Sequence, residues 1–506
     1  MMVLTDPTNG VLLGTLLTEL ADCSSCVQIL IHGISMDSRK TKPGDLFLAC
    51  HGAKTSGVHY LREAINAGAV AIAAEADAGL QRFINDVPVV AVKDLSANAG
   101  IIAARFHDHP SAKMQVIGVT GTNGKTSTAC FIAQAIGGIE NHKAGLIGTM
   151  GYGIWPQLKP GANTTPDPVT IQATLADFFR RGIDAVIMEV TSIGLEQGRV
   201  HGVDFQIGIY TNLTVDHLDY HGNMHAYAES KKQLFTCHGL RHAIINVDDE
   251  FGRKLAGALP SSVNCIGYGL VERFATMAGT KRKSLVQAVV EENTKGLALT
   301  IRSPWGEGQL QVAIGGRYNA YNLLASLAAL CLLEVPLQLA LDRLAVLSPV
   351  PGRLEHFGGA ALPDVYVDYA HTPDALNNVL SYLRGQCPGR LICVFGCGGN
   401  RDRTKRPQMG AIAASQASMV ILTNDNPRHE DPQTIIDDIL SGISNRSGVC
   451  VELDRGLAIA HAIRSAQAGD MILVAGKGHE TYQEVAGQRY PFSDRQLIRR
   501  LLGNEA

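Results

Sequence analysis

The sequence has no excess of basic residues and no long hydrophobic run. Its 44 Lys and Arg residues stand against 47 Asp and Glu residues, for a formal net charge of −3. This balance gives no support for nucleic acid or an anionic membrane as the main partner. No apolar run reaches the roughly 18–20 residues that a membrane-spanning helix requires. The N-terminal segment has acidic residues and no basic stretch, unlike a secretory signal. We therefore expect no nucleic-acid partner and no membrane insertion.

Cysteine clusters of the metal-binding kind are also missing. The eleven cysteines are scattered, and the closest pairs are Cys23/Cys26 and Cys393/Cys397. Neither pair is accompanied by a second Cys or His pair at zinc spacing. Buried or incidental thiols in a reducing compartment explain this pattern best, so we expect a cytoplasmic protein.

The chain is too long for one hydrophobic core, and its pattern divides it into three blocks. Residues 1–112 contain short apolar runs between turns, which predict a small α/β unit. In residues 113–347, near-continuous apolar strands alternate with helical spacers, which indicates a parallel sheet covered on both faces. A stretch of alternating residues within 260–315 indicates an antiparallel edge. Residues 348–506 repeat the parallel pattern after a turn-rich linker.

The stretch "VIGVTGTNGKTSTA" at 116–129 has the composition of a phosphate-binding loop between a strand and a helix. Gly121 and Gly124 let the backbone turn its N–H groups inward, Lys125 adds charge, and the Thr126 hydroxyl suits Mg²⁺. The usual spacing would place a glycine at Val119. A plain glycine turn is the alternative, but Gly-Lys-Thr stands where the strand gives way to the helix, which favours phosphate binding.

Acidic, imidazole and lysine side chains follow in the same block. Glu189 ends an apolar strand, where it suits a metal ion or a helix cap. Asp216, His217, Asp219 and His221 crowd six residues, and either a Mg²⁺ site or a solvated loop explains them. Helical spacing places Lys231 on one face with Tyr227 and Phe235, which allows an inward direction, but a snorkelling lysine that reaches water is the more common explanation of such a residue.

In the third block, charged side chains follow the strands. Asp368, His371, Arg401, Arg428 and Glu480 stand in "DYAHTPD", "GCGGNRDRTKRP", "DNPR" and "GKGHE". Ligands of open α/β sheets bind beyond the carboxyl ends of the strands. Two arginines with a carboxylate suit a substrate that carries both carboxylate and ammonium groups, although each alone could be a salt bridge.

Taken in order, these motifs resemble the Mur ligase family of peptidoglycan synthesis. The resemblance runs through "DSRKTKPGDLF", "GVTGTNGKT", "NTTPDP", "HLDYHG", "PGRLEHF", "DYAHTPDAL", "GCGGNRDRTKRP", "DNPR" and "GKGHE". It implies a central P-loop ATPase-like sheet flanked by a small N-terminal α/β domain for UDP-MurNAc and a C-terminal Rossmann-like domain for an amino acid. It also makes Val119 a normal occupant of the family's ATP loop.

The resemblance implies an ATP-dependent amide ligase that forms a C–N bond through an acyl phosphate. The small-molecule substrates would be ATP, UDP-MurNAc-L-Ala-D-Glu and meso-diaminopimelate, and the protein would be a monomer. "DNPR" is the motif version associated with diaminopimelate rather than lysine. The same reaction with L-lysine and a folylpolyglutamate-type ligase are the near alternatives. A kinase and a P-loop switch are the alternatives from other classes.

The implied site residues fall into four sets. The ATP set is Gly121, Thr122, Asn123, Gly124, Lys125, Thr126, Ser127, Asn319, Arg353, Asp368 and His371. The UDP-MurNAc-dipeptide set is Ser38, Thr164, Thr165, Ser192, Gln197 and Arg199. The diaminopimelate set is Arg401, Asp425, Asn426, Pro427, Arg428, Gly476 and Glu480. The catalytic residues are Lys125, Glu189, His217 and Lys231.

The resemblance further implies two Mg²⁺ ions, with Thr126, Glu189, His217 and Lys231 as the metal-binding residues. Lys231 matches the lysine that the family carries as a carbamate formed from CO₂, which would turn a cation into a metal-binding anion. One position departs from the family pattern: Ile193 in "EVTSIGL" replaces a histidine. Any metal or phosphate contact of that histidine is therefore in doubt here.

Overall fold

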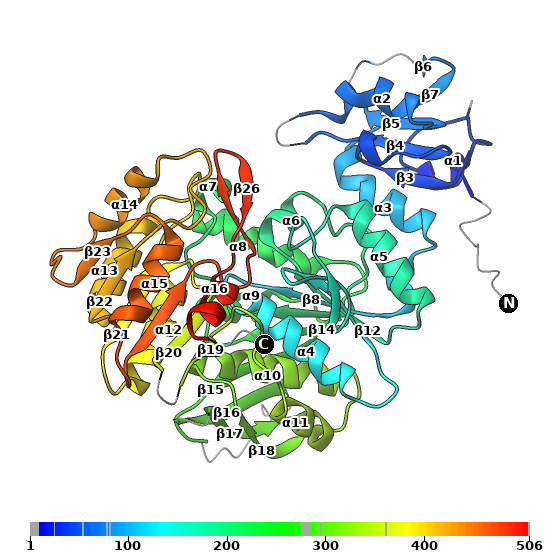
Figure 1. The fold of residues 1–506 in the computed structure, drawn as a ribbon. Helices are drawn as coiled ribbons and strands as arrows, with labels where there is room; N and C mark the ends of the chain where they lie inside the picture. The colour runs from blue at the N-terminus through cyan, green and yellow to red at the C-terminus, as the bar shows by residue number, and fades with distance from the viewer. Residues whose placement is uncertain are drawn as a thin grey trace.

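The computed structural model describes residues 10–503 except 25, 53–54, 77–78, 80–81, 275–283, 294–295 and 360–361. Three sheet-centred units follow one another along the chain. The N-terminal unit (blue) stands apart at the top right of Figure 1, the middle unit runs from cyan to green, and the third unit (yellow to red) lies on the left. No helix of the described residues is long and apolar enough to span a bilayer.

The N-terminal unit is built on a sheet whose neighbouring strands β3, β4, β5 and β7 are parallel, with β6 antiparallel at the edge. The apolar runs predicted as strands form β4, β5 and β7. The strands are β3 (Gly33–Ser35), β4 (Asp45–Ala49), β5 (Ala71–Glu75), β6 (Phe83–Ile84) and β7 (Val87–Val92), with a separate pair β1 (Val11–Leu12) and β2 (Leu30–Ile31). The helices are α1 (Leu13–Leu17), α2 (Leu61–Asn66) and α3 (Leu95–Phe106), with short 3-10 turns η2 (Ser38–Lys40), η3 (Gly57–Tyr60) and η5 (Pro110–Lys113).

The middle unit holds one long mixed sheet. In the described part of the chain its strand order is β11-β10-β9-β12-β8-β13-β14-β15-β16-β17-β18, parallel from β9 to β16 and antiparallel at both ends. The expected antiparallel edge within 260–315 is therefore confirmed. The strands are β8 (Gln115–Thr120), β9 (Ala144–Gly148), β10 (Gly151–Ile154), β11 (Gln157–Lys159), β12 (Ala185–Glu189), β13 (Ile207–Tyr210), β14 (His242–Asn246), β15 (Asn264–Leu270), β16 (Leu285–Asn293), β17 (Gly296–Ser303) and β18 (Gly306–Val312).

Helices cover both faces of this sheet, as the near-continuous apolar strands predict. Successive strand residues alternate between two cores: Ile187 packs with α4 and α10, whereas Val186 and Met188 pack with α5 on the other face. The helices are α4 (Lys125–Gly137), α5 (Pro168–Arg180), α6 (Ser192–Glu196), α7 (Leu218–His221), α8 (Met224–Lys232), α9 (Glu250–Ala258), α10 (Arg317–Leu332) and α11 (Leu337–Ala345), with η6 (Gln233–Thr236) after α8.

The third unit has the strand order β19-β20-β24-β21-β22-β23, parallel except for β19. The strands are β19 (Glu355–Phe357), β20 (Asp364–Asp368), β21 (Leu391–Phe395), β22 (Met419–Leu422), β23 (Val449–Val451) and β24 (Met471–Ala475), followed by a hairpin of β25 (Tyr482–Val485) and β26 (Gln488–Pro491). The helices are α12 (Pro373–Gln386), α13 (Lys405–Gln416), α14 (Pro432–Leu440), α15 (Arg455–Ser465) and α16 (Asp494–Leu501). The α/β class is confirmed, and the domain bounds at 112/113 and 347/348 stay predictions.

Candidate active site between the middle and third units

The glycine-rich loop joins β8 to α4. Gly121 has φ +145° and Gly124 has φ +86°, and a Cβ added to them would lie 1.9 Å from Thr211 Oγ1 and 2.4 Å from Asn322 Oδ1, respectively. Only glycine fits both positions. Val119 is fully buried inside β8 and pairs with Glu189 and Ile209 on the two neighbouring strands. The strand therefore continues through the position where the usual spacing expects a glycine, and the turn begins only after Thr120.

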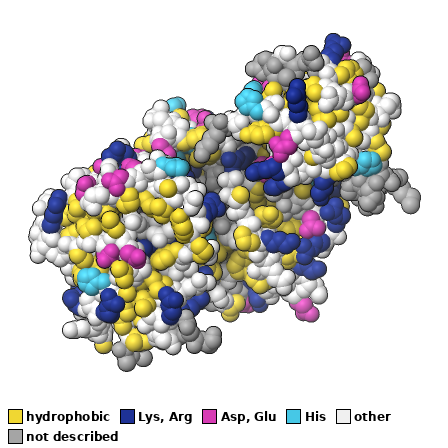
Figure 2. Space-filling model, turned by 45° about the horizontal axis from the view of Figure 1, so that its top comes forward, with side chains coloured by type: hydrophobic (Ala, Val, Ile, Leu, Met, Phe, Trp, Pro, Cys, Tyr) yellow, Lys and Arg dark blue, Asp and Glu magenta, His cyan; other side chains and the backbone are white. Residues whose placement is uncertain are grey.

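A cavity of about 710 Å³ lies in front of this loop, between the middle and third units. Figure 2 shows the molecule hollowed between the lobe on its left and those on its right, with Lys and Arg side chains beside the hollow. Its walls include most of the predicted ATP residues together with others of the predicted sets. Those lining it are Thr122, Asn123, Gly124, Lys125, Thr126, Ser127, Thr164, Thr165, Glu189, Arg199, His217, Asn319, Arg353, Asp368, His371 and Arg401.

Glu189 and Thr126 form a compact oxygen cluster at the head of α4. Glu189 is 1% exposed and accepts hydrogen bonds from Thr126 Oγ1 at 2.8 Å, Thr149 N at 2.7 Å and Thr149 Oγ1 at 3.1 Å. A buried carboxylate beside a hydroxyl at a phosphate loop is a donor set that suits Mg²⁺. Among the described residues, no group of three or more His, Cys, Asp and Glu side chains is placed to hold a metal ion. The full metal set of Thr126, Glu189, His217 and Lys231 stays a prediction.

Lys231 lies inside the protein, on α8, and is 1% exposed. Its Nζ donates to Gly121 O at 2.9 Å and lies 4.2 Å from the centre of the Tyr227 ring. Burial, with Lys125 nearby, holds the pKa of Lys231 well below its ordinary value. The snorkelling alternative is therefore wrong, because the helix face that carries Lys231 packs against the loop rather than facing water.

Asp216 forms the polar centre of the segment that follows β13. It is 5% exposed and faces His217 Nε2 at 3.4 Å, His371 Nε2 at 3.6 Å and Lys405 Nζ at 3.7 Å. Burial opposes its charge, but these groups outweigh burial and hold the pKa of Asp216 well below its ordinary value. Burial, Lys125 and Lys231 lower the pKa of His217 to about 3, so its imidazole is neutral near pH 7. The alternative of a solvated loop is therefore wrong for Asp216, which is buried among charged groups.

Two hydrogen bonds tie the third unit to the loop itself. Arg353 Nη2 donates to Thr126 Oγ1 at 3.0 Å, and Asn123 Nδ2 donates to Asp374 Oδ2 at 3.0 Å. The Arg353 guanidinium also stacks 4.4 Å from the centre of the Tyr369 ring. These contacts bring the phosphate loop and the carboxyl end of β20 to one place.

The predicted substrate residues of the middle unit gather around the end of β12. Thr165 Oγ1 donates to Glu189 O at 2.9 Å, and Arg199 donates to Thr165 O at 2.7 Å and to Gln197 Oε1 at 2.7 Å. Thr164 Oγ1 lies 3.0 Å from Thr149 Oγ1, and Ser192 Oγ lies 3.0 Å from His221 Nε2. Ser38 lies apart from them, buried in η2 of the N-terminal unit. Ile193, the departure from the family pattern, lines the large cavity.

The predicted diaminopimelate residues meet at the ends of the adjacent strands β24, β21 and β22 of the third unit. Asn426 Nδ2 donates to Glu480 Oε2 at 2.9 Å, and Arg428 Nη1 donates to Gly399 O at 2.7 Å. A Cβ added to Gly476 would lie 2.6 Å from Asp425 Oδ2, so this backbone passes close to that carboxylate. Pro427 lies between Asn426 and Arg428, and Arg401 follows β21 on the wall of the large cavity.

Sequence reasoning missed several charged residues of this region. Lys477 is fully buried and donates to Glu480 Oε2 at 2.8 Å and Asn426 Oδ1 at 3.1 Å. Glu484 Oε2 lies 3.7 Å from Arg428 Nε. Asp374 and Lys405 reach the middle unit. Lys477 stands inside the motif "GKGHE", so the motif itself was a signal for it.

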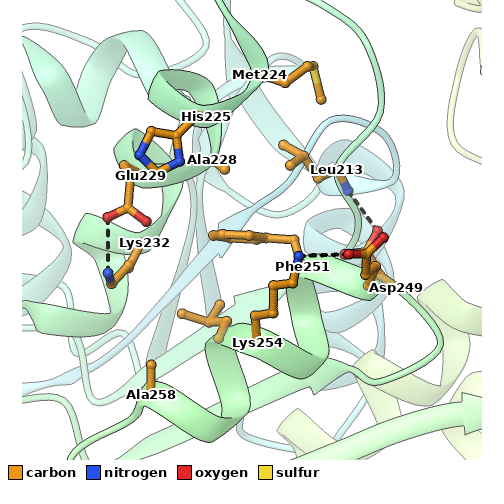
Figure 3. A pocket seen from close by; sticks show the side chains of 12 residues that line it. Leu213, Met224, His225, Ala228, Glu229, Lys232, Asp249, Phe251, Lys254 and Ala258 are labelled. Atoms are coloured by element: carbon orange, nitrogen blue, oxygen red, sulfur yellow. Dashed lines mark hydrogen bonds and ion pairs between the residues drawn. The ribbon is translucent and has the colours of Figure 1, made fainter.

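Smaller cavities lie elsewhere among the described residues. One of about 480 Å³ lies between α8 and α9, where the ion pairs Lys232–Glu229 and Lys254–Glu250 flank Phe251 (Figure 3). No predicted site residue lines it. Another, of about 540 Å³, lies between the N-terminal and middle units and includes Gln197, with Glu75 and His51 on the opposite side.

Comparison with known proteins adds evidence on the family to which this chain is related. Residues 30–110 match the family description "Mur ligase family, catalytic domain", residues 119–330 match "Mur ligase middle domain", and residues 352–478 match "Mur ligase, glutamate ligase domain". The chain is 44% identical to UDP-N-acetylmuramoyl-L-alanyl-D-glutamate–2,6-diaminopimelate ligase of Coxiella burnetii over 95% of this chain and 98% of the relative. It is 48% identical to the ligase of the same name from Chromobacterium violaceum over 92% of each. A solved structure of a ligase with this name superposes with a TM-score of 0.68 at 34% identity, covering 98% of this chain and 99% of that one.

Proposed function

The chain belongs to the Mur ligase family, and we propose that it joins meso-diaminopimelate to the D-glutamate of UDP-MurNAc-L-Ala-D-Glu in an ATP-dependent reaction of peptidoglycan precursor synthesis. The observation that carries this proposal is the shared cavity in which the phosphate loop faces the strand ends of the third unit. Of the predicted amino-acid residues, Arg401 lines this cavity, and the others follow the neighbouring strands β24 and β22 of the same sheet. An acyl phosphate formed at the loop would thus lie close to an incoming amine.

The reaction divides into two steps. The γ-carboxylate of the D-glutamyl residue first attacks the γ-phosphorus of ATP, which gives an acyl phosphate and ADP. The amine of diaminopimelate then attacks the acyl carbon, and the tetrahedral intermediate expels phosphate and loses a proton. Both steps depend on positioning and on the neutralisation of charge.

Different residues of this chain would bind the phosphates, the metal and the two ends of the UDP-MurNAc-dipeptide. The N–H groups of residues 121–126 and the Lys125 ammonium would hold the ATP phosphates, with Asn319, Arg353, Asp368 and His371 around the nucleotide. Thr126 and Glu189 would hold Mg²⁺, which neutralises phosphate charge when bound; we propose two ions, with His217 and Lys231 completing the metal set. Thr164, Thr165, Ser192, Gln197 and Arg199 would hold the dipeptide end, and Ser38 the uridine end.

We also propose that Lys231 is a carbamate formed with CO₂. Burial and Lys125 lower the pKa of Lys231, which favours the neutral amine that reacts with CO₂, and carbamylation would remove the cost of burying the remaining cationic form beside Lys125. A monomeric state and a cytoplasmic location remain part of the proposal. Mass spectrometry of the intact enzyme at high bicarbonate tests the modification: a gain of one CO₂ that Lys231→Arg abolishes is expected, and an unmodified amine in active enzyme contradicts it.

One assay separates the reaction from its alternatives. Protein with ATP, Mg²⁺ and UDP-MurNAc-L-Ala-D-Glu should release phosphate only when an amino acid is added, and the product should carry one added diaminopimelate by mass. Preference for L-lysine would favour the lysine-adding reaction. A stable phosphorylated nucleotide product without amine would indicate a kinase, and ATP hydrolysis indifferent to all substrates would indicate a switch. Activity on a folyl substrate instead would indicate a folylpolyglutamate-type ligase.

A further inference from the structure

The hairpin of β25 and β26 is bonded to the loop that carries the "DNPR" motif. Arg428 N donates to Glu484 O at 2.9 Å, and Ala486 N donates to Arg428 O at 2.6 Å. Arg428 has φ +54°, a left-handed conformation that a non-glycine residue adopts only when its surroundings hold it there. The hairpin supplies that support, so the direction in which Arg428 leaves the backbone depends on β25.

The neighbouring residues fasten the same two segments together. Glu484 N donates to Asn426 Oδ1 at 2.9 Å, and Gln483 Nε2 donates to Asp425 O at 3.0 Å. Asn426 Oδ1 also accepts from the buried Lys477 at 3.1 Å. The backbone of Glu484 is therefore fixed relative to the whole motif, and its side chain starts from a defined place.

That side chain faces the arginine. Glu484 Oε2 lies 3.7 Å from Arg428 Nε, while Arg428 Nη1 donates to Gly399 O at 2.7 Å. Within the described part of the chain, Arg428 Nη2 makes no hydrogen bond. Both side chains are about one-fifth exposed, at 22% and 23%, so this ion pair is better shielded than one at an open surface. Glu484 and Gly399 hold the guanidinium at two points, which leaves the Nη2 N–H groups to donate hydrogen bonds to a ligand.

We propose that Glu484 is a positioning residue that orients the Arg428 guanidinium toward the distal carboxylate of the amino-acid substrate. The inference rests on the proposed function, in which Arg428 binds that carboxylate through parallel N–H donors. Without Glu484 the Arg428 side chain samples more orientations. Binding of the substrate must then fix one of them, which weakens binding. The loss falls on the binding of diaminopimelate, while the phosphate loop, which belongs to the middle unit, keeps its function.

Steady-state kinetics of the full chain test this assignment. Glu484→Ala should raise the KM for diaminopimelate about fivefold, equal to about 1 kcal/mol at 1.4 kcal/mol per tenfold. Its kcat and its KM for ATP should stay within about twofold of the parent, and Glu484→Asp should recover part of the loss. Gln488→Ala, on the same hairpin but facing Tyr490 rather than Arg428, is the matched control and should change none of these values.

A double-mutant cycle separates orientation of Arg428 from damage to the hairpin. In an Arg428→Ala background, Glu484→Ala should add no further rise in KM. An additive rise, or an unchanged KM in the single variant, overturns the inference. Failure of the proposed function looks different: the parent enzyme then shows no diaminopimelate-dependent phosphate release, whereas failure of the inference alone leaves that release and the Arg428→Ala effect intact.

Discussion

Asp494→Ala should destabilise the third unit strongly, because it breaks a fully buried ion pair. Both side chains are completely buried, and Arg455 donates from Nε to Asp494 Oδ1 and from Nη2 to Asp494 Oδ2, each at 2.8 Å. Removing the carboxylate leaves a guanidinium without its counter-charge in the interior. Breaking such a pair costs about 3–5 kcal/mol. At roughly 2–4 °C per kcal/mol for a unit of this size, the melting temperature should fall by about 6–20 °C.

The effect should reach the amino-acid site. Arg455 also donates to Ala475 O at 2.9 Å and to Asn424 O at 3.3 Å. These carbonyls directly precede Gly476 and Asp425, so one guanidinium holds the ends of β24 and β22 in place. Below its melting temperature, the Asp494→Ala variant should therefore show a raised KM for diaminopimelate.

Scanning calorimetry of the full chain measures the shift. Asp177→Ala is the control, because the pair Asp177–Arg181 is about half exposed and its loss should leave the transition unmoved. The double variant Arg455→Met/Asp494→Leu should return part of the lost stability, since an apolar pair needs no counter-charge while Ala475 O and Asn424 O lose a donor. A loss below about 1 kcal/mol for Asp494→Ala would refute the reasoning about uncompensated burial.

Three further changes follow from the described geometry. Arg428→Ala should raise the KM for diaminopimelate about a hundredfold with kcat within a few-fold, as expected for a lost charge-assisted contact; an unchanged KM would contradict its role. Glu189→Gln should lower kcat at least about a hundredfold in the phosphate-release assay while the fold, monitored by circular dichroism, stays intact; near-parental turnover would exclude its metal role. Burial lowers the pKa of His107 to about 4, so the unfolded chain binds the extra proton as pH falls below about 6.5; stability should drop by about 2 kcal/mol between pH 7 and 5, and His107→Phe should flatten that slope, whereas an equal slope would argue against it.

Elements set by consecutive residues could be predicted from the sequence. The phosphate loop, the strand that ends in Glu189 and the strand ends of the third unit all follow from local patterns of apolar, glycine and charged residues. The spacing of Lys231 to Tyr227 did not settle whether its side chain points inward or to water, and its burial is seen only in the structure. Phe235, the third residue of that face, lies beyond α8 in η6, which the simple helical spacing did not predict.

Contacts between distant segments could not be predicted in this way. Lys477 finds Asn426 only because β24 and β22 flank β21, an order that no local pattern reveals. Glu484 reaches Arg428 through a hairpin after β24, and Asn123 reaches Asp374 across 251 positions of the chain. The Lys477–Asn426 contact depends on strand order. The Glu484–Arg428 and Asn123–Asp374 contacts depend on the folding and packing of whole elements.

The two hydrogen bonds of the Thr126 hydroxyl connect nucleotide binding at the loop with the position of the third unit. It donates to Glu189 and accepts from Arg353, so the same oxygen serves the loop and the contact between two units. A metal–nucleotide complex that takes this oxygen competes with Arg353 for it. Occupancy of the loop and the position of the third unit are therefore thermodynamically linked, and each must change the equilibrium of the other by the same factor. The affinity for ATP would then depend on how the middle and third units sit relative to each other.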